Sequence, residues 1–259
     1  MTKNAVAKKA STALAEIDLF DPKDVEEFSS KDIIIPRLNI LQALSPQVNK
    51  KKPEYIEGAE QGDFCDVATS EIFKGELIII PCFYAMVYLE WAPRDSGRGL
   101  VANHGMDASI LAKCKKNEKN QNILSNGNYV VETATYYVLN MSAGGRPSFI
   151  PLSSTQLKAA RKWNTLIASQ KINNPATGED VPAPIFFRAW KAVSVESSNQ
   201  QGDWYGWKFA PGDTILEIDP TGDLLHNAKE LRRMAQEGLV KGDVQEAHDT
   251  VDDDDDKAF

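Results

Sequence analysis

The chain has 259 residues, of which 42% are hydrophobic and 25% charged, and its formal net charge is −8. These values are ordinary for a soluble globular protein with one large domain or two small ones. No run approaches 18 apolar residues and no basic-then-apolar leader opens the chain, so we expect no membrane span, no secretion signal and a cytoplasmic protein. The three cysteines are widely spaced, which favours neither a disulfide framework nor a zinc site.

The chain opens on a polar segment. Residues 1–30 are small, polar and charged, and we expect a flexible arm with one short helix around residues 22–28. The ordered body is predicted to begin at residues 33–36. A basic turn at residues 50–52 follows, and then a short hairpin that turns near residues 74–75.

Three strands are predicted next. Residues 76–91 are the longest candidate, because β-branched and aromatic residues fill this segment without a helical stripe. Pro81 lies inside it and predicts an edge position or a bulge. Residues 129–141 and 149–152 are expected to form the second and third strands.

A helix follows, with Ser153 or Ser154 as its expected N-cap. Its apolar residues recur with helical spacing at Leu157, Ala160, Trp163 and Ile167. Its other face carries Lys158, Arg161 and Lys162.

Two more strands, at residues 185–196 and 203–209, and an amphipathic helix over residues 224–237 complete the body. This order does not alternate as βαβ units do. We therefore predict a mainly β (α+β) fold, an OB-like Greek-key barrel with an inserted helix, a C-terminal helix and a disordered acidic tail. The expected divisions are the arm at 1–30, the barrel domain at 31–240 and the tail at 241–259.

The charge of the chain is unevenly placed. Residues 243–259 hold eight acids and one base, a net charge of −7, whereas residues 31–210 hold 20 Lys and Arg against 17 Asp and Glu, a net charge of +3. The tail contains Asp252, Asp253, Asp254, Asp255, Asp256 and, as its last residue, Phe259. Mutual repulsion should keep the aspartates extended in water.

An acidic segment with one aromatic residue can dock into basic, apolar-floored pockets of partner proteins, or occupy a cationic groove on its own body. Two other interpretations stay open. The segment is also typical of a solubility tail, and residues 253–257 spell a processing-protease sequence used in expression tags.

Motifs of enzymes are missing from the sequence. It contains no phosphate-binding glycine loop, dinucleotide-binding glycine motif, zinc-protease helix or serine-hydrolase elbow. The turn at residues 219–223 lacks the glycine and glutamate of a calcium loop. We therefore predict no catalytic residue, no metal site and no cofactor.

Aromatic and basic residues alternate on the predicted strands, and this combination suits single-stranded nucleic acid, whose bases stack on rings while cations follow the phosphates. In residues 185–196 we assign Ile185, Phe187, Ala189, Val193 and Val195 to the core. The opposite face would then present Arg188 and Trp190. Trp204 shares a face with Lys208, and Tyr84 shares one with Tyr88. Any single strand aromatic is more often a core residue than a stacking platform.

Two loops add further candidates. Trp91, Arg94 and Arg98 lie in a loop that could close over a strand as a clamp, and Lys50, Lys51 and Lys52 are candidate phosphate contacts or ordinary solvated residues.

These features together resemble the single-stranded DNA-binding proteins of bacteriophages. The matching residues are the Asp252–Asp256 run with Phe259, and the segments 90–97 and 154–163 are similar to segments of such proteins. The chain departs from the pattern at Lys257 and Ala258, which separate the acidic run from the aromatic residue. The resemblance implies an OB-fold body, action in an infected bacterial cell, and recruitment of replication or recombination proteins by the tail.

The first hypothesis is therefore a non-catalytic, sequence-independent single-stranded DNA-binding protein whose tail recruits partners and competes for the DNA groove. The alternative is a phage interaction protein or DNA mimic that inhibits a host nucleic-acid enzyme. An enzyme with an unfamiliar site is a third hypothesis. A homodimer and a preference for RNA stay open.

Overall fold

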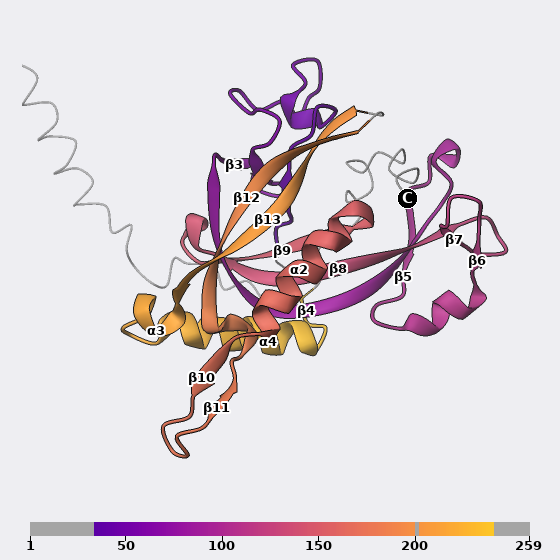
Figure 1. Cartoon of the computed structure of the whole chain (residues 1–259). Helices are drawn as coiled ribbons and strands as arrows, with labels where there is room; N and C mark the ends of the chain where they lie inside the picture. Colours follow the sequence, from indigo (N-terminus) through magenta and orange to yellow (C-terminus); the bar gives the residue numbers. More distant parts are fainter. Residues whose placement is uncertain (1–33, 200–201, 241–259) are drawn as a thin grey trace, which may run out of the picture. The chain divides into compact units, whose positions relative to one another are not determined.

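The computed structural model describes residues 34–199 and 202–240, all of which belong to one compact unit that begins at Ile34 (Figure 1). The predicted N-terminal arm, the acidic tail and the centre of the last hairpin turn lie outside the described residues.

Five strands and one helix make the body. They are β4 (Glu76–Trp91), β8 (Tyr129–Asn140), β9 (Arg146–Ser153), α2 (Leu157–Ala168), β12 (Arg188–Asn199) and β13 (Gly202–Thr214). The first three strands form an antiparallel meander, and β12 returns after α2 to pair with the start of β4 while β13 pairs with β12. This is Greek-key order. The predicted mainly β, OB-like fold with an inserted helix is confirmed.

Smaller elements extend this body. A three-stranded sheet contains β1 (Leu38–Ile40), β2 (Phe64–Asp66) and β3 (Glu71–Phe73). A projecting hairpin contains β10 (Lys171–Asn173) and β11 (Asp180–Pro182) (Figure 1). Outside the connection between β4 and β8, the other helices described are α3 (Ile215–Ile218), α4 (Asp223–Gln236) and the 3₁₀ turns η2 (Pro46–Val48), η5 (Met141–Ala143), η6 (Ser154–Gln156) and η7 (Ile185–Phe187).

The connection between β4 and β8, residues 92–128, is called the arm from here on, and it is separate from the N-terminal segment 1–30. It contains η3 (Arg94–Ser96), β5 (Leu100–Asn103), η4 (Ala108–Lys113), β6 (Lys115–Lys116) and β7 (Asn122–Ile123). Strand β5 pairs with the end of β4, β7 pairs with the start of β8, and β6 pairs with β7, so the arm prolongs the sheet beyond the barrel.

Strands β4 and β8 are covered on both faces, as Figure 1 shows for α2 and α4. We call one side the α2 face; it carries Tyr84, Met86, Tyr88, Glu132 and Tyr136. We call the other side the α4 face; it carries Phe83, Val87, Leu89, Thr133 and Tyr137. Ala160 and Trp163 of α2 share a core with the barrel interior, whereas Ala228 and Leu231 of α4 share a second core with the opposite face.

Trp163 anchors α2 in the barrel. Its ring stacks on that of Phe209, with the ring centroids 3.8 Å apart and the ring planes inclined by 9°. The centroid of the Tyr136 ring lies 4.3 Å away, and the Trp190 ring packs edge-on with its centroid at 6.0 Å. The side chain is almost fully buried. Truncating such an aromatic typically costs about 3–5 kcal/mol, so this contact fixes the position of the helix.

Two local predictions have different outcomes. The bulge expected at Pro81 is confirmed, because the pairing with β8 shifts between Pro81 and Phe83. The serine N-cap is wrong: neither Ser153 nor Ser154 caps the helix, which starts after the 3₁₀ turn η6.

Two glutamine side chains satisfy the free edge of β13. The Gln42 amide accepts from the backbone N–H of Tyr205 and donates to its carbonyl, both at 2.9 Å. Gln156 accepts from the N–H of Trp207 at 3.2 Å. Gly62, at φ +91°, lets the Tyr205 ring approach, since a Cβ there would lie 2.8 Å from the ring. Side chains thus replace a missing strand in closing the barrel.

Replacing Gln42 by alanine should lower the free energy of unfolding by about 1–3 kcal/mol, because two backbone groups of Tyr205 lose their partners. Urea denaturation measures this, and Gln47→Ala is the matched control because its half-buried side chain has no hydrogen bond among the described residues. Equal effects of the two substitutions would show that the Gln42 amide does not close the edge.

Candidate nucleic-acid interface

The α2 face holds a half-buried aromatic residue, Tyr84. Its ring lies 5.0 Å from that of Tyr136. The Tyr136 hydroxyl donates to Oδ1 of Asn164 at 2.7 Å and lies 3.1 Å from the carbonyl oxygen of Ala160, so it fixes α2 against the sheet. Burial raises the pKa of Tyr136 far above its usual range, so the hydroxyl stays a donor at neutral pH. Tyr84 therefore lies one ring away from the helix.

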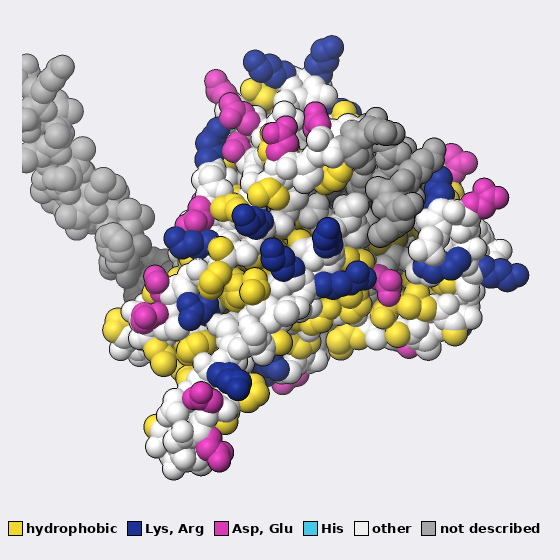
Figure 2. All heavy atoms as spheres, in the orientation of Figure 1, with side chains coloured by type: hydrophobic (Ala, Val, Ile, Leu, Met, Phe, Trp, Pro, Cys, Tyr) yellow, Lys and Arg dark blue, Asp and Glu magenta, His cyan; other side chains and the backbone are white. Residues whose placement is uncertain are grey.

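The exposed side of α2 is cationic. Lys158, Arg161 and Lys162 are spaced i, i+3 and i+4, so they share one side of the helix, and all three are exposed. None of them forms an ion pair with another residue of the described ranges. Figure 2 shows Lys and Arg side chains across the middle of this view, where Figure 1 places α2.

The arm brings more cations to the far end of the sheet. Lys113, Lys115, Lys116 and Lys119 are all exposed. Figure 2 shows Lys and Arg side chains at the end where Figure 1 places β6 and β7, with hydrophobic side chains between these and the row over α2. One acid, Glu132, lies on the α2 face close enough to Tyr88 to raise the pKa of its phenol, after the larger effect of burial.

A buried carboxylate holds the arm in place. Oε1 of Glu90 accepts hydrogen bonds from Nδ2 of Asn128 at 2.5 Å and from Nδ2 of Asn126 at 3.3 Å. Nε2 of His104 lies 2.9 Å from Oε2 of Glu90. The hydrogen bond from Asn128 lowers the pKa of Glu90 most, so the group stays ionised at neutral pH. This network ties two loops of the arm to the end of β4.

Three predicted stacking residues are buried, which corrects the sequence analysis. Trp190 is 1% exposed, because the start of β12 has a core on each side: Ala189 packs beneath α4, and Trp190 and Ala192 pack in the barrel interior. Trp91 is 3% exposed and packs on the α4 face at the end of β4 rather than in a loop. Tyr88 is 8% exposed, under Ile110 and Val130.

Arg188 has a structural role in place of the predicted phosphate contact. Its Nε donates to Oε1 of Gln170 at 3.1 Å, and Nη1 donates to the carbonyl oxygen of Gly212. The guanidinium thereby joins the start of β12 to β13 and to the end of the inserted helix.

The other predicted residues lie at separate places. Trp204 is half-buried and Lys208 exposed, and both lie on the outer side of the β12–β13 hairpin, opposite Trp207 and Phe209. Lys50, Lys51 and Lys52 are exposed in the loop between β1 and β2, and Arg98 is exposed in the arm. The Arg94 side chain and the tail residues Asp252–Asp256 and Phe259 are outside the described part.

The cations of α2 were not assigned a role from the sequence, although their spacing was visible there. A helix with one apolar and one basic side, inserted between strands, was the signal that could have found them. Across residues 34–199 and 202–240, no cluster of His, Cys, Asp or Glu is placed to hold a metal ion. In the same part of the chain, no helix is long and apolar enough to cross a membrane.

The comparisons with known proteins give a match to a family model. A model of the Pam3 phage gp34-like protein family matches residues 4–241. No curated protein and no solved structure matches the chain. The family description names a bacteriophage, which agrees with the origin implied by the resemblance in sequence. The chain belongs to the family of Pam3 phage gp34-like proteins.

Proposed function

We propose that this protein binds single-stranded DNA without sequence preference through the α2 face, and that it is not an enzyme. The observation that carries the proposal is the row of three cations on the exposed side of α2, Lys158, Arg161 and Lys162, none of which has an ion-pair partner among residues 34–199 and 202–240. Cations without acidic partners keep their charge available for phosphates, and release of counterions then drives binding.

Tyr84 supplies the second part of the proposed interface. It is half-buried: its ring is tilted by 48° against that of Tyr136, and part of the side chain is accessible. A base stacked on such a ring gains about 1–3 kcal/mol whatever its identity, because every base has a π face. Tyr84 and the α2 cations together would bind bases and phosphates without reading sequence.

The fold gives support by analogy. OB folds bind oligonucleotides on the outer face of their second and third strands and with the loops that flank it. The arm takes the position of one such loop here, whereas the outer sides of β8 and β9 pack beneath α4, so the analogy supports the arm and not the strands. Since a fold alone does not fix function, the charges and Tyr84 carry more weight than this analogy.

The acidic segment at residues 252–256 enters the proposal as a competitor and a recruiter. It would occupy the α2 face weakly when DNA is absent, and bind replication or recombination proteins of the infected cell when DNA displaces it. A DNA mimic would present acidic groups on its body, so the cations of α2 favour DNA binding over the inhibitor hypothesis.

Replacing Arg161 and Lys162 by glutamine should weaken binding to an oligo(dT) roughly tenfold at low salt. It should also reduce the slope of the logarithm of the binding constant against the logarithm of the salt concentration by about 1.4, since each single-strand phosphate contact contributes about 0.7. Fluorescence anisotropy measures both quantities. The control is Lys74→Gln with Lys191→Gln, two exposed cations paired with acids elsewhere, which changes net charge equally. If the control loses as much affinity as the α2 variant, α2 is not the contact surface.

Replacing Tyr84 by leucine should weaken oligo(dT) binding by about 1–3 kcal/mol through loss of stacking, with little change in the salt slope. Tyr84→Phe keeps the ring and should bind as the original protein does. The same anisotropy titrations test this, and a leucine variant that binds unchanged would exclude Tyr84 as a platform.

Replacing the five aspartates 252–256 by asparagine should tighten oligo(dT) binding several-fold at low salt, and less at high salt, because competition between anions is screened. A matched control neutralises five exposed acids elsewhere, namely Glu54, Glu57, Glu179, Asp180 and Asp213. Competition predicts the larger gain for the tail variant. Unchanged or weaker binding of that variant would refute the competition.

A further inference from the structure

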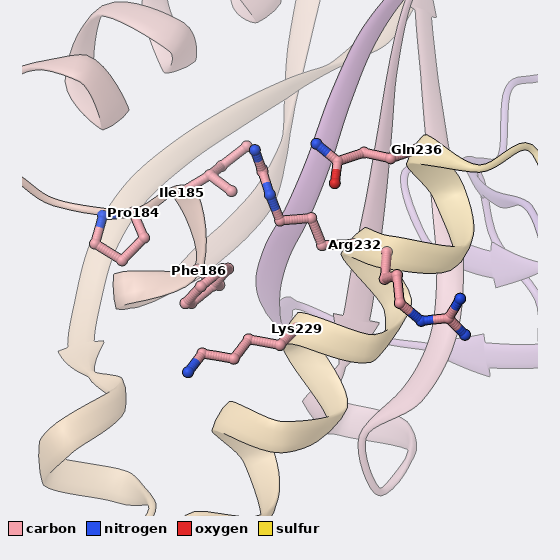
Figure 3. Close-up of a pocket in the computed structure, with 7 residues that line it drawn as sticks. Pro184, Ile185, Phe186, Lys229, Arg232 and Gln236 are labelled. Carbon is pink, nitrogen blue, oxygen red and sulfur yellow. The ribbon is translucent and has the colours of Figure 1, made fainter.

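A groove lies between α4 and the segment around η7, on the opposite side of the sheet from the α2 face (Figure 3). Its volume is about 370 Å³. The residues that line it are Pro184, Ile185, Phe186, Lys229, Arg232, Arg233 and Gln236. None of these residues has a place in the proposed DNA interface.

The floor of the groove is apolar and contains Pro184, Ile185 and Phe186. Phe186 is 8% exposed because it also packs into the core beneath α4. A small apolar surface at the bottom of a polar groove suits one aromatic or aliphatic side chain from a ligand.

Two cations on α4 border this floor. Lys229 and Arg232 are one turn apart, and Figure 3 shows both side chains extending from the helix toward the η7 segment. The Arg232 guanidinium lies 5.9 Å from the centre of the Phe83 ring and donates to the carbonyl oxygen of Cys82 at 3.4 Å. Neither cation forms an ion pair within the described ranges.

Arg233 differs, because it pairs with Glu230 and with Glu237 on the same helix. Its charge is therefore largely compensated. Lys229 and Arg232 are the cations left to attract a ligand, and the amide of Gln236 adds a hydrogen-bonding group at one end of the groove.

We propose that this groove binds the acidic segment of the same chain, with aspartates from residues 252–256 against Lys229 and Arg232 and the Phe259 ring on the Phe186 floor. The match is one of chemistry, since a run of five acids is followed three residues later by an aromatic side chain. Two neighbouring cations such as these both attract an acidic ligand and orient it.

The length of chain allows the contact. Asp252 lies twelve residues beyond Val240, and this length of chain could span up to about 40 Å when extended. Helix α4 has 14 residues and is about 21 Å long. Because the chain leaves α4 at the end that carries Gln236, the whole groove is within reach, and linkage raises the effective concentration of the segment to the millimolar range.

One segment cannot lie in the groove and on the α2 face at the same time. It would therefore divide its time between the two sites, and its competition with DNA on the α2 face would be weak. This consequence for DNA rests on the proposed function, whereas docking in the groove does not.

The test uses the full chain with Phe259 replaced by p-benzoyl-phenylalanine and no nucleic acid present. After irradiation, peptide mapping should place cross-links on residues 184–186 or on α4. Lys229→Glu should lower their yield roughly five- to tenfold, as expected when an attractive charge pair becomes repulsive near a protein surface. Lys229→Arg should retain the yield, and thermal melts check that both variants fold.

Two outcomes would overturn the proposal. One is cross-linking that maps to α2 with none on residues 184–186 or α4, or that ignores the charge at position 229. The other is cross-linking found only between chains in a mixture of isotopically light and heavy protein, which would assign the groove to a second copy. If the cross-links form as expected while oligo(dT) does not bind, the groove stands and the proposed DNA function fails.

Discussion

Strand β4 has to bury both of its faces, and much of the structure follows from this constraint. Its sequence is apolar at almost every position, so alternation gives two hydrophobic sides. The barrel and α2 cover one side, and α4 covers the other. The helices thus have fixed roles in the core, and each leaves a polar side outward. The cations of α2 and of α4 lie on these outward sides.

The same constraint decides how aromatic residues are used. The barrel interior takes a connected group of rings that runs from Phe64 through Trp207 and Phe209 to Trp163. Among the five tryptophans, four are buried and Trp204 is half-buried. An interface for single-stranded DNA therefore has to rely mainly on cations and on a partly accessible tyrosine. Tryptophan fluorescence would report on binding only near Trp204.

Much of the fold could be predicted from the sequence, because local patterns determine it. The largely apolar sequence of residues 76–91, in which Glu76 and Glu90 are the charged residues, gives β4 its observed ends, and the apolar spacing around Trp163 gives the inserted helix. The side of a strand that faces the core is harder to predict. At the start of β12 both sides are buried, since Ala189 packs beneath α4 while Trp190 and Ala192 pack in the barrel interior. Lys191, inside the face assigned to the core, was the sign against that assignment.

The sequence pattern indicated which types of residue to look for, basic and aromatic, better than it indicated their positions in the fold. Arg188 is committed to Gln170 and Gly212, and the cations that we propose in its place are those of α2. The network that orders the arm joins Glu90 to His104 and Asn128, and no local pattern in the sequence indicates such a contact. Contacts between distant loops depend on the completed fold.

The central claim is that single-stranded DNA lies on the α2 face. Photo-cross-linking of the full chain to an oligonucleotide that carries 5-iodouracil tests it most directly, because the modified bases mark the side chains they stack on. The account predicts adducts in the β4 peptide that contains Tyr84, with further adducts in α2 or the arm. Adducts confined to other peptides, or an oligonucleotide that fails to bind at low salt, would contradict it.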